Sequence, residues 1–172
     1  MASSDEGPAP ADPRAAAARA AGSELVRDFG LLIIAASRLE QRIDAALRAR
    51  CGIRHTMFEV LIALCGAPEG RLPQRALGEK LVLTSGGVTR LIDQMQEAGF
   101  VTRSTPAGDR RITIAEVTER GRTTFVEAVA VHAEVVGEHF VRPVAAADYP
   151  VLIRALSSID EAGQGSAPGA GA

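Results

Sequence analysis

The first third of the chain carries a stripe of apolar residues at helical spacing. Between residues 23 and 50 the apolar positions recur every three or four residues, at Leu25, Phe29, Leu32, Ala36, Leu39, Ile43 and Leu47. This spacing puts them on one face of an α-helix, and Cys51-Gly52 marks its end. The pattern predicts a long amphipathic helix over residues 23–50, whose apolar face needs a groove to lie in.

Two shorter helices are expected next. Thr56 and Glu59 have the S/T-x-x-E spacing in which each side chain binds a backbone N–H of the other residue, so a helix is predicted over residues 56–64. The turn at residues 67–70 ends it. A third helix is expected over residues 73–81, because the proline at its start loses no hydrogen bond in the first turn of a helix.

A fourth helix and a hairpin follow. Thr84 or Ser85 can cap a helix that ends at Ala98-Gly99. The apolar positions of this helix repeat with helical period and are Val88, Leu91, Ile92 and Met95. Residues 100–104 and 112–117 then alternate apolar and polar side chains, and a basic loop joins them. This pattern predicts a two-stranded hairpin.

Two further helices complete the chain. Thr118 is placed to cap a long helix, and a last helix is expected over residues 148–159. The stripe of the long helix consists of Phe125, Val129, His132, Val136 and Phe140. Two short helices followed at once by a hairpin have the order of a winged helix-turn-helix. The expected fold class is mostly α with a small β-hairpin wing, built as a DNA-binding lobe plus a region of long helices.

Both ends of the chain differ in composition from the rest. Residues 1–22 are rich in Ala, Pro, Asp and Ser, and residues 161–172 in Gly, Ala and Pro. Such segments bury too little apolar surface to offset the entropy of ordering. Both are therefore expected to be disordered, although residues 14–21 could extend the first helix.

Composition and charge narrow the class of protein. The 172 residues suit one domain with additional helices. The chain has no run of eighteen apolar residues and no signal peptide, so a cytoplasmic protein with no membrane association is expected. The net charge is −2, yet residues 71–111 hold seven basic and four acidic residues, a local charge of +3 against −5 elsewhere. Positive charge is thus concentrated where phosphate neutralisation would require it.

Three sequence elements resemble the MarR family of transcriptional regulators. They are TSGGVTRLIDQMQEAGF at residues 84–100, VTRSTPAGDRR at 101–111 and EVTERG at 116–121. The resemblance covers residues 23–160 and implies a homodimer that binds double-stranded DNA at an inverted repeat. In this family arrangement residues 51–117 are the DNA-binding lobe, and the long helices of residues 23–50 and 118–160 form the dimerisation region.

The same resemblance assigns DNA contacts to the fourth helix and the hairpin. The helix would lie in the major groove, where an Arg can fork onto a guanine edge and a Thr can meet a thymine methyl. The Asp-x-Arg motif at the hairpin tip would direct an Arg into the adjacent minor groove. The candidate DNA-binding residues are Ser85, Thr89, Arg90, Arg103, Asp109, Arg110 and Arg111. Gly86-Gly87 departs from the family by removing two side chains, which shifts sequence preference toward the wing and DNA shape.

A small-molecule effector is also implied by the resemblance. Effectors of the family bind between the dimerisation helices and the DNA-binding lobe and release a repressor from DNA. Arg38, Arg42 and His55 are the polar residues that could face such a crevice in this chain. No cofactor is expected.

Other interpretations rest on fewer residues. His132 and His139 could suggest a metal site, but a pair of histidines on a helical stripe is more often packed against neighbours. Cys51 and Cys65 could sense oxidants, although no electropositive setting is visible for either. No hydrolase, metalloprotease, P-loop or dinucleotide motif is present, so an enzyme is not expected. The alternative function is a helical protein-interaction module without DNA binding.

Overall fold

The computed structural model describes residues 12–81, 83–106 and 112–165. These residues fall into two units, one ending at Arg38 and one beginning at Leu39. Helix α2 (Glu24–Cys51) belongs to both, and its bounds confirm the helix predicted over residues 23–50. Among the described residues, no helix combines the length and the apolar character that crossing a bilayer requires.

The first unit contains a second helix that the composition did not predict as a separate element. Helix α1 (Pro13–Ala21) has a proline in its first turn, and the side chain of Asp12 accepts the N–H of Arg14 at 3.0 Å. Both features favour the start of a helix. Residues 13–21 are therefore helical, and the predicted disorder over residues 1–22 does not hold for them.

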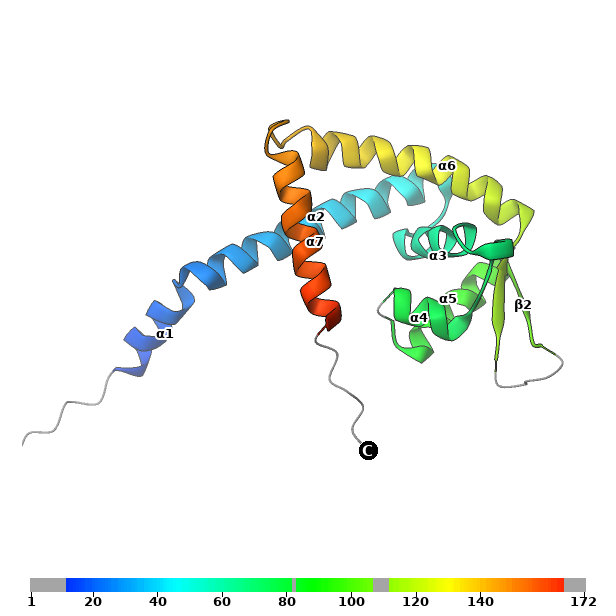
Figure 1. Cartoon of the computed structure of the whole chain (residues 1–172), viewed down its shortest axis with the longest axis horizontal. Helices are drawn as coiled ribbons and strands as arrows, with labels where there is room; N and C mark the ends of the chain where they lie inside the picture. Colours follow the sequence, from blue (N-terminus) through cyan, green and yellow to red (C-terminus); the bar gives the residue numbers. More distant parts are fainter. Residues whose placement is uncertain (1–11, 82, 107–111, 166–172) are drawn as a thin grey trace, which may run out of the picture. The chain divides into compact units, whose positions relative to one another are not determined.

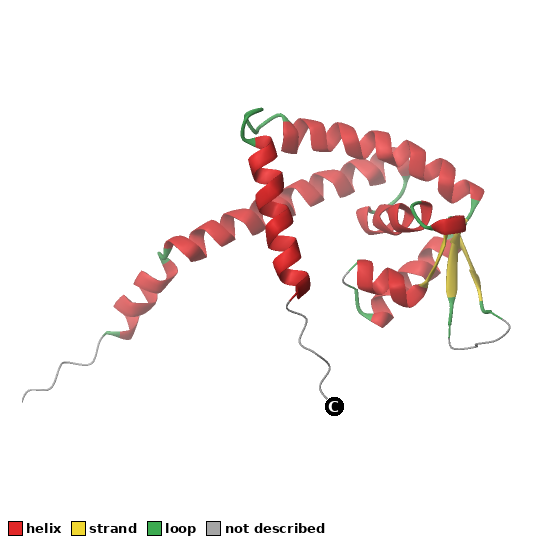
Figure 2. Ribbon diagram, in the orientation of Figure 1, coloured by secondary structure: helices red, strands yellow, loops and turns green. Residues whose placement is uncertain are grey.

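The second unit is built mainly from helices, with one small sheet (Figures 1 and 2). Its helices are α3 (His55–Cys65), α4 (Gln74–Lys80), α5 (Ser85–Glu97), α6 (Glu119–Val136) and α7 (Tyr149–Gly165), with a 3-10 turn at Pro68–Gly70 and a π-helical turn at Gly137–Val141. The predicted fold class is thus confirmed. Helix α7 extends beyond the predicted end at residue 159, so residues 161–165 are helical rather than disordered.

The sheet has three antiparallel strands where two were predicted. Strands β2 (Val101–Ser104) and β3 (Ile114–Val117) form the expected hairpin, and β1 (Arg71–Pro73) pairs with the other edge of β3. Leu72 lies opposite Ala115 in this register. Strand β1 therefore fixes the start of α4 against the base of the hairpin.

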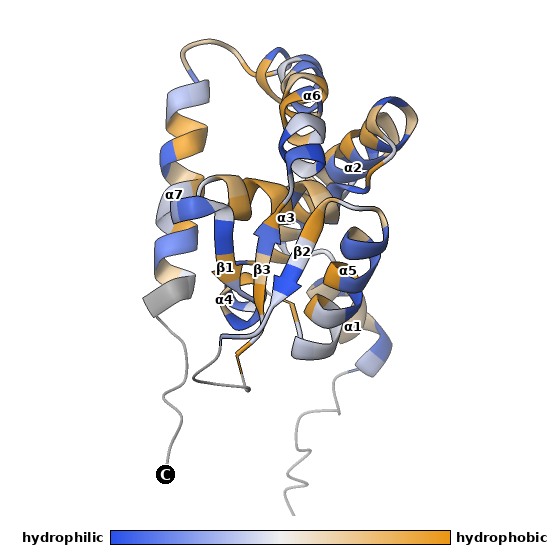
Figure 3. Cartoon of the chain, turned by 90° about the vertical axis from the view of Figure 1, so that its right-hand side faces the viewer, coloured by the Kyte–Doolittle hydropathy of each residue, from blue (hydrophilic) through white to orange (hydrophobic). Residues whose placement is uncertain are grey.

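The core of the second unit is centred on α3, which packs against α4, α5, α6 and β3. Helix α3 is hydrophobic over most of its length (Figure 3). Its side chains include Val60, Leu61 and Leu64, which are completely buried. The predicted apolar face of α5 is buried as well, and Ile43 and Leu47 of α2 join the same core. This packing holds the helix-turn-helix and the hairpin as one body.

Two of the predicted helix caps are present. The Thr84 hydroxyl oxygen accepts the N–H of Gly87 at 3.2 Å at the start of α5. The Thr118 hydroxyl oxygen accepts the N–H of Gly121 at 3.0 Å at the start of α6, and its hydrogen is donated to the carbonyl of Gly99 at 2.7 Å. Thr118 thus ties the turn that follows α5 to the start of α6.

The capping box predicted for α3 is absent. The residue before the helix is Arg54, whose side chain makes no capping hydrogen bond. The free N–H of His55 is instead donated to the carboxylate of Asp44 in α2 at 2.9 Å. A side chain from another helix therefore accepts a backbone N–H at the start of α3, where the sequence predicts a local capping box.

Close packing at Gly121 gives a stability prediction. A Cβ atom at Gly121 would lie 2.3 Å from the carbonyl oxygen of Phe100 and 2.8 Å from Val117, whereas one at Gly137 would meet no atom within 4 Å. We expect Gly121→Ala to lower the free energy of unfolding by about 1–3 kcal/mol. The matched change Gly137→Ala should raise it by roughly 0.4–1 kcal/mol. Chemical denaturation measures both, and a neutral Gly121→Ala would contradict this packing.

Candidate nucleic-acid interface

The outer face of helix α5 is the candidate surface for DNA. Ser85, Thr89 and Arg90 are exposed on it, while the opposite face of the helix is buried in the core. The Thr89 hydroxyl donates to the carbonyl of Ser85 at 3.1 Å, so its methyl group and an oxygen lone pair stay available for other contacts. Among the described residues, Arg90 has no hydrogen bond or ion pair. The structure thus brings three predicted site residues together on one accessible helix face.

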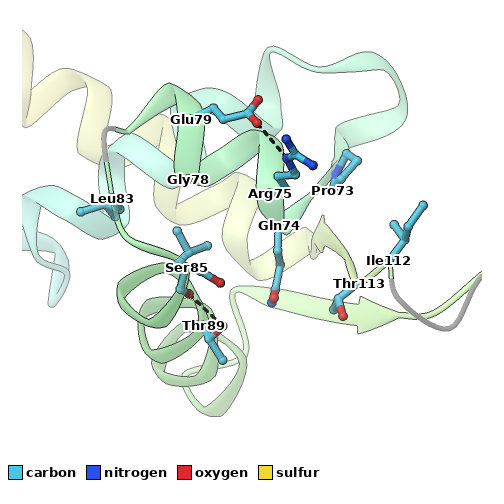
Figure 4. Close-up of a pocket in the computed structure, with 11 residues that line it drawn as sticks. Pro73, Gln74, Arg75, Gly78, Glu79, Leu83, Ser85, Thr89, Ile112 and Thr113 are labelled. Atoms are coloured by element: carbon cyan, nitrogen blue, oxygen red, sulfur yellow. Dashed lines mark hydrogen bonds and ion pairs between the residues drawn. The ribbon is translucent and has the colours of Figure 1, made fainter. Parts of the chain in front are cut away.

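A pocket of about 750 Å³ adjoins this face. It lies between α4, the start of α5 and the residues that lead into β3, and Figure 4 shows the side chains around it. Its lining residues are Pro73, Gln74, Arg75, Gly78, Glu79, Leu83, Ser85, Val88, Thr89, Ile112 and Thr113. Arg75 and Glu79 form an exposed ion pair at 3.0 Å. Sequence reasoning missed Gln74, Arg75 and Thr113, because the pocket exists only once β1 and β3 are paired.

Arg103 has a different environment from the other predicted site residues. It extends from β2 to α5, where its Nε donates to the Oε1 of Gln96 at 2.7 Å and its guanidinium forms an ion pair with Asp93. Only 25% of the Arg103 side chain is exposed. Its charge is therefore engaged within the protein. These contacts hold the hairpin at a fixed position relative to α5.

The remaining predicted hairpin residues lie outside the described residues. They are Asp109, Arg110 and Arg111. Description of the chain resumes at Ile112, which is exposed, and the carbonyl of Thr113 accepts the backbone N–H of Gln74 at 2.9 Å. The base of the hairpin is thus anchored to the first residue of α4.

The predicted effector-binding residues are not equally placed. Arg38 is exposed in the first unit, and Arg42 is exposed on the part of α2 in the second unit. His55 is half-buried at the start of α3, where its Nδ1 nitrogen is buried and has no hydrogen-bond partner among the described residues. Of the three, only His55 therefore lies within a packed environment.

His55 belongs to a cluster of rings that sequence reasoning did not identify. Its ring stacks on the ring of His132 of α6, with a distance of 6.0 Å between the ring centroids. Phe58 of α3 also faces His132, and their ring centroids are 4.9 Å apart. Phe125 adds a fourth ring at 5.8 Å from Phe58. Burial, with a smaller contribution from the neighbouring His55, lowers the pKa of His132. The neutral imidazole is therefore favoured at this junction of α3 and α6.

Asp44 lies beside this ring cluster. Burial alone would raise the pKa of its carboxyl, but the hydrogen bonds from the His55 backbone and from Arg48 outweigh burial and lower it. The Arg48 Nε donates to Asp44 at 2.6 Å. Asp44 therefore stays ionised and links α2 to α3.

The two cysteines do not have the features of reactive thiolates. Burial raises the pKa of Cys51, and the charge of Glu127 raises it further. Burial also raises the pKa of Cys65, against a smaller opposing effect of Arg122. Both side chains therefore favour the protonated thiol at neutral pH.

Comparison with known proteins shows similarity to one family. The model of the MarR family matches residues 51–112, which span α3, α4, α5 and most of the hairpin. This segment of the chain is thus similar to the MarR family. The HTH-type transcriptional regulator MhqR of Bacillus subtilis is 31% identical over 87 residues, which cover 51% of this chain and 59% of MhqR. The HTH-type transcriptional regulator PrsX of Escherichia coli is 32% identical over 91 residues, covering 53% of this chain and 54% of PrsX. The chain thus spans little more than half the length of these curated relatives.

Solved structures extend the MarR-family likeness of the fold over most of the chain. AbsC of Streptomyces coelicolor superposes with a TM-score of 0.75 at 23% identity, covering 84% of this chain and 97% of AbsC. CouR of Rhodococcus jostii, solved with p-coumaroyl-CoA, gives a TM-score of 0.67 at 27% identity and covers 80% and 95%. MosR of Mycobacterium tuberculosis, solved with DNA, gives 0.65 at 25% identity and covers 80% and 96%. The similarity of fold therefore includes the long helices as well as the winged lobe.

Proposed function

We propose that this protein is a transcriptional regulator that binds double-stranded DNA as a homodimer, with α5 in the major groove. The observation that carries the proposal is the two-sided character of α5. Its inner face is buried in the core, and its outer face presents Ser85, Thr89 and Arg90 to solvent. A helix held rigidly by one face and free on the other suits insertion into a major groove.

Charge distribution supports the same surface. The segment 71–111 is basic in a protein whose net charge is −2. Lys and Arg that neutralise phosphates release counterions, which favours binding in proportion to the number of contacts made. The transcriptional regulator MosR, 25% identical to this chain, was solved with DNA, which supports DNA as the partner.

The proposed wing contacts come from the family motif. Arg111 enters the minor groove next to the site of α5, Asp109 orients it, and Arg110 shares or takes that role. Arg103 acts by positioning the hairpin through Asp93. This division separates base reading on α5 from backbone contacts on the wing.

Homodimer formation is supported by apolar side chains that the single chain leaves exposed. On α2 they are Leu25, Val26, Phe29, Leu31, Leu32, Ile33 and Ile34. On α6, on the turn after it and on α7 they are Val126, Val129, Val141, Val151, Ile153 and Ile159. Large exposed apolar surface is typical of a protein interface. A second copy of the chain covers the stripe of Leu25, Phe29 and Leu32 on α2, together with apolar faces of α6 and α7, in a closed two-fold dimer.

We further propose that the protein is a cytoplasmic repressor that a small molecule releases from DNA. CouR, at 27% identity, was solved with p-coumaroyl-CoA, which supports a ligand of small-molecule size. Arg42 and His55 are the candidate ligand contacts in the second unit, and Arg38 is the candidate in the first. Binding at Arg42 and His55 would act on the junction of α2, α3 and α6 that Asp44 and His132 also occupy.

A gel-shift experiment tests the proposed function. The purified chain is incubated with a pool of random-sequence duplexes, and bound duplexes are amplified over several rounds. We expect enrichment of one sequence family that is retained against excess unrelated DNA. Failure to enrich any sequence would favour the alternative of a protein-interaction module.

A further inference from the structure

Gln74 has an unusual position in the pocket beside α5. It is the first residue of α4, and its side chain extends from that helix into the space between Thr89 and Thr113 (Figure 4). Its Nε2 nitrogen is buried and has no hydrogen-bond partner among the described residues. A buried amide donor without an acceptor costs free energy, so its presence calls for a reason.

The surroundings of Gln74 indicate what would satisfy this donor. Its backbone is held in place because its N–H is donated to Thr113. Ser85 and Thr89, two of the candidate DNA contacts, line the same pocket. DNA lying along α5 would therefore cover the mouth of the pocket and bring hydrogen-bond acceptors to it.

We infer that this pocket receives a phosphate group of the DNA backbone and that the carboxamide of Gln74 donates to a phosphate oxygen. This inference rests on the proposed function. The last torsion of a glutamine side chain is soft, so the carboxamide turns its nitrogen toward the pocket when an acceptor enters. The Ser85 hydroxyl lies in the same pocket and provides a second donor.

Arg75 completes the phosphate site at the rim of the pocket. Its ion pair with Glu79 joins side chains that are 91% and 65% exposed. An exposed pair at this helical spacing contributes little to stability, so Arg75 can leave Glu79 for a phosphate. The site thus combines two neutral donors, Gln74 and Ser85, with one cation at its edge.

The test is the substitution Gln74→Met, which keeps the length of the side chain and removes the amide. We expect affinity for a DNA duplex to fall roughly tenfold for each protomer bound, because a hydrogen bond to a charged acceptor is removed. The midpoint of thermal unfolding of the free protein should not fall, and should rise by up to roughly 2–4 °C, because a buried donor without a partner is removed. Affinity and stability would then change in opposite directions.

Gln94→Met is the matched control for stability. Gln94 lies on α5 and its Oε1 accepts a hydrogen bond from Arg54, so the same substitution there removes a satisfied amide. We expect its thermal midpoint to fall. If Gln74→Met lowers the midpoint as Gln94→Met does, the Gln74 amide has a partner in the free protein and the inference is wrong.

Two duplexes and a salt series identify the acceptor. The probes are a duplex enriched from the random pool by the wild-type protein and a shuffled duplex of the same composition. A phosphate contact predicts an equal fold-loss on both, and parallel plots of affinity against salt, because a neutral side chain releases no counterion. Loss on the enriched duplex alone would make Gln74 a base reader and overturn the inference. Unchanged binding by Gln74→Met would also overturn it, whereas failure of the wild-type protein to bind any duplex would refute the proposed function itself.

Discussion

Replacing Arg90 with alanine should weaken binding to the enriched duplex by roughly 30-fold or more. The residue is exposed on the outer face of α5, next to Thr89. A bidentate contact between an arginine and a guanine contributes about 1–3 kcal/mol of discrimination, and a dimer makes this contact in both half-sites. The loss should be much smaller on a shuffled duplex, because only base recognition is removed. Fluorescence anisotropy with both duplexes measures the difference.

Two further variants define the role of Arg90. Arg90→Lys keeps the positive charge but loses the planar fork, so it should resemble Arg90→Ala on the enriched duplex and the wild-type protein on the shuffled one. Arg111→Ala should weaken binding to both duplexes and reduce the salt slope by roughly 0.9 for each phosphate that the variant no longer neutralises. Equal behaviour of Arg90→Ala and Arg111→Ala on both duplexes would show that α5 does not read bases.

Placing a charge on the apolar stripe of α2 should have an even larger effect on DNA binding. Phe29 is 65% exposed in the single chain, and Leu32 follows it on the same face. We expect Phe29→Glu to give a folded monomer, because the side chain contributes to a dimer and not to the core. Loss of the second recognition helix should then reduce affinity for an inverted repeat by at least roughly 100-fold.

Ile34→Glu is the matched control for this variant. Ile34 is also an exposed apolar residue of α2, at 50%, but it lies nearly opposite the stripe of Phe29 and Leu32. It should therefore remain a dimer by sedimentation velocity. If Phe29→Glu is dimeric at micromolar concentration, the stripe is not the dimer interface.

The elements that depend on local sequence could be predicted. The stripe of α2 follows directly from apolar residues every three or four positions, and the caps at Thr84 and Thr118 lie within three residues of the N–H groups they accept. The same holds for β2 and β3, whose alternation is visible in the sequence. These signals were sufficient to predict a winged helix with long flanking helices.

The features that sequence reasoning missed depend on residues distant in the chain. Strand β1 is a strand only because β3 pairs with it, since three residues carry no alternation of their own. At the start of α3, the backbone N–H of His55 is donated to the carboxylate of Asp44, which lies eleven residues earlier in the chain. The local pattern predicts Thr56 as the capping residue of α3, but the acceptor at the start of this helix comes from α2, which packs beside it.

The candidate site shows the same division. Helical geometry predicts that Ser85, Thr89 and Arg90 lie opposite the buried face of α5, and the family resemblance makes them candidates for DNA contact. Arg103 was assigned by its charge, and only the tertiary structure reveals that Asp93 and Gln96 engage it. The importance of Gln74 was likewise invisible in the sequence, because an unsatisfied amide is a property of its surroundings.

Hydroxyl-radical footprinting of the wild-type protein on the enriched duplex tests the central claim most directly. A two-fold dimer with one α5 in each half should protect an inverted repeat whose half-sites lie about one helical turn, ~10 bp, apart. Protection in the minor groove should flank each half-site where the wings approach. The account predicts this symmetric pattern, and a footprint confined to one unsymmetrical site, or no protection above that on a shuffled duplex, would contradict it.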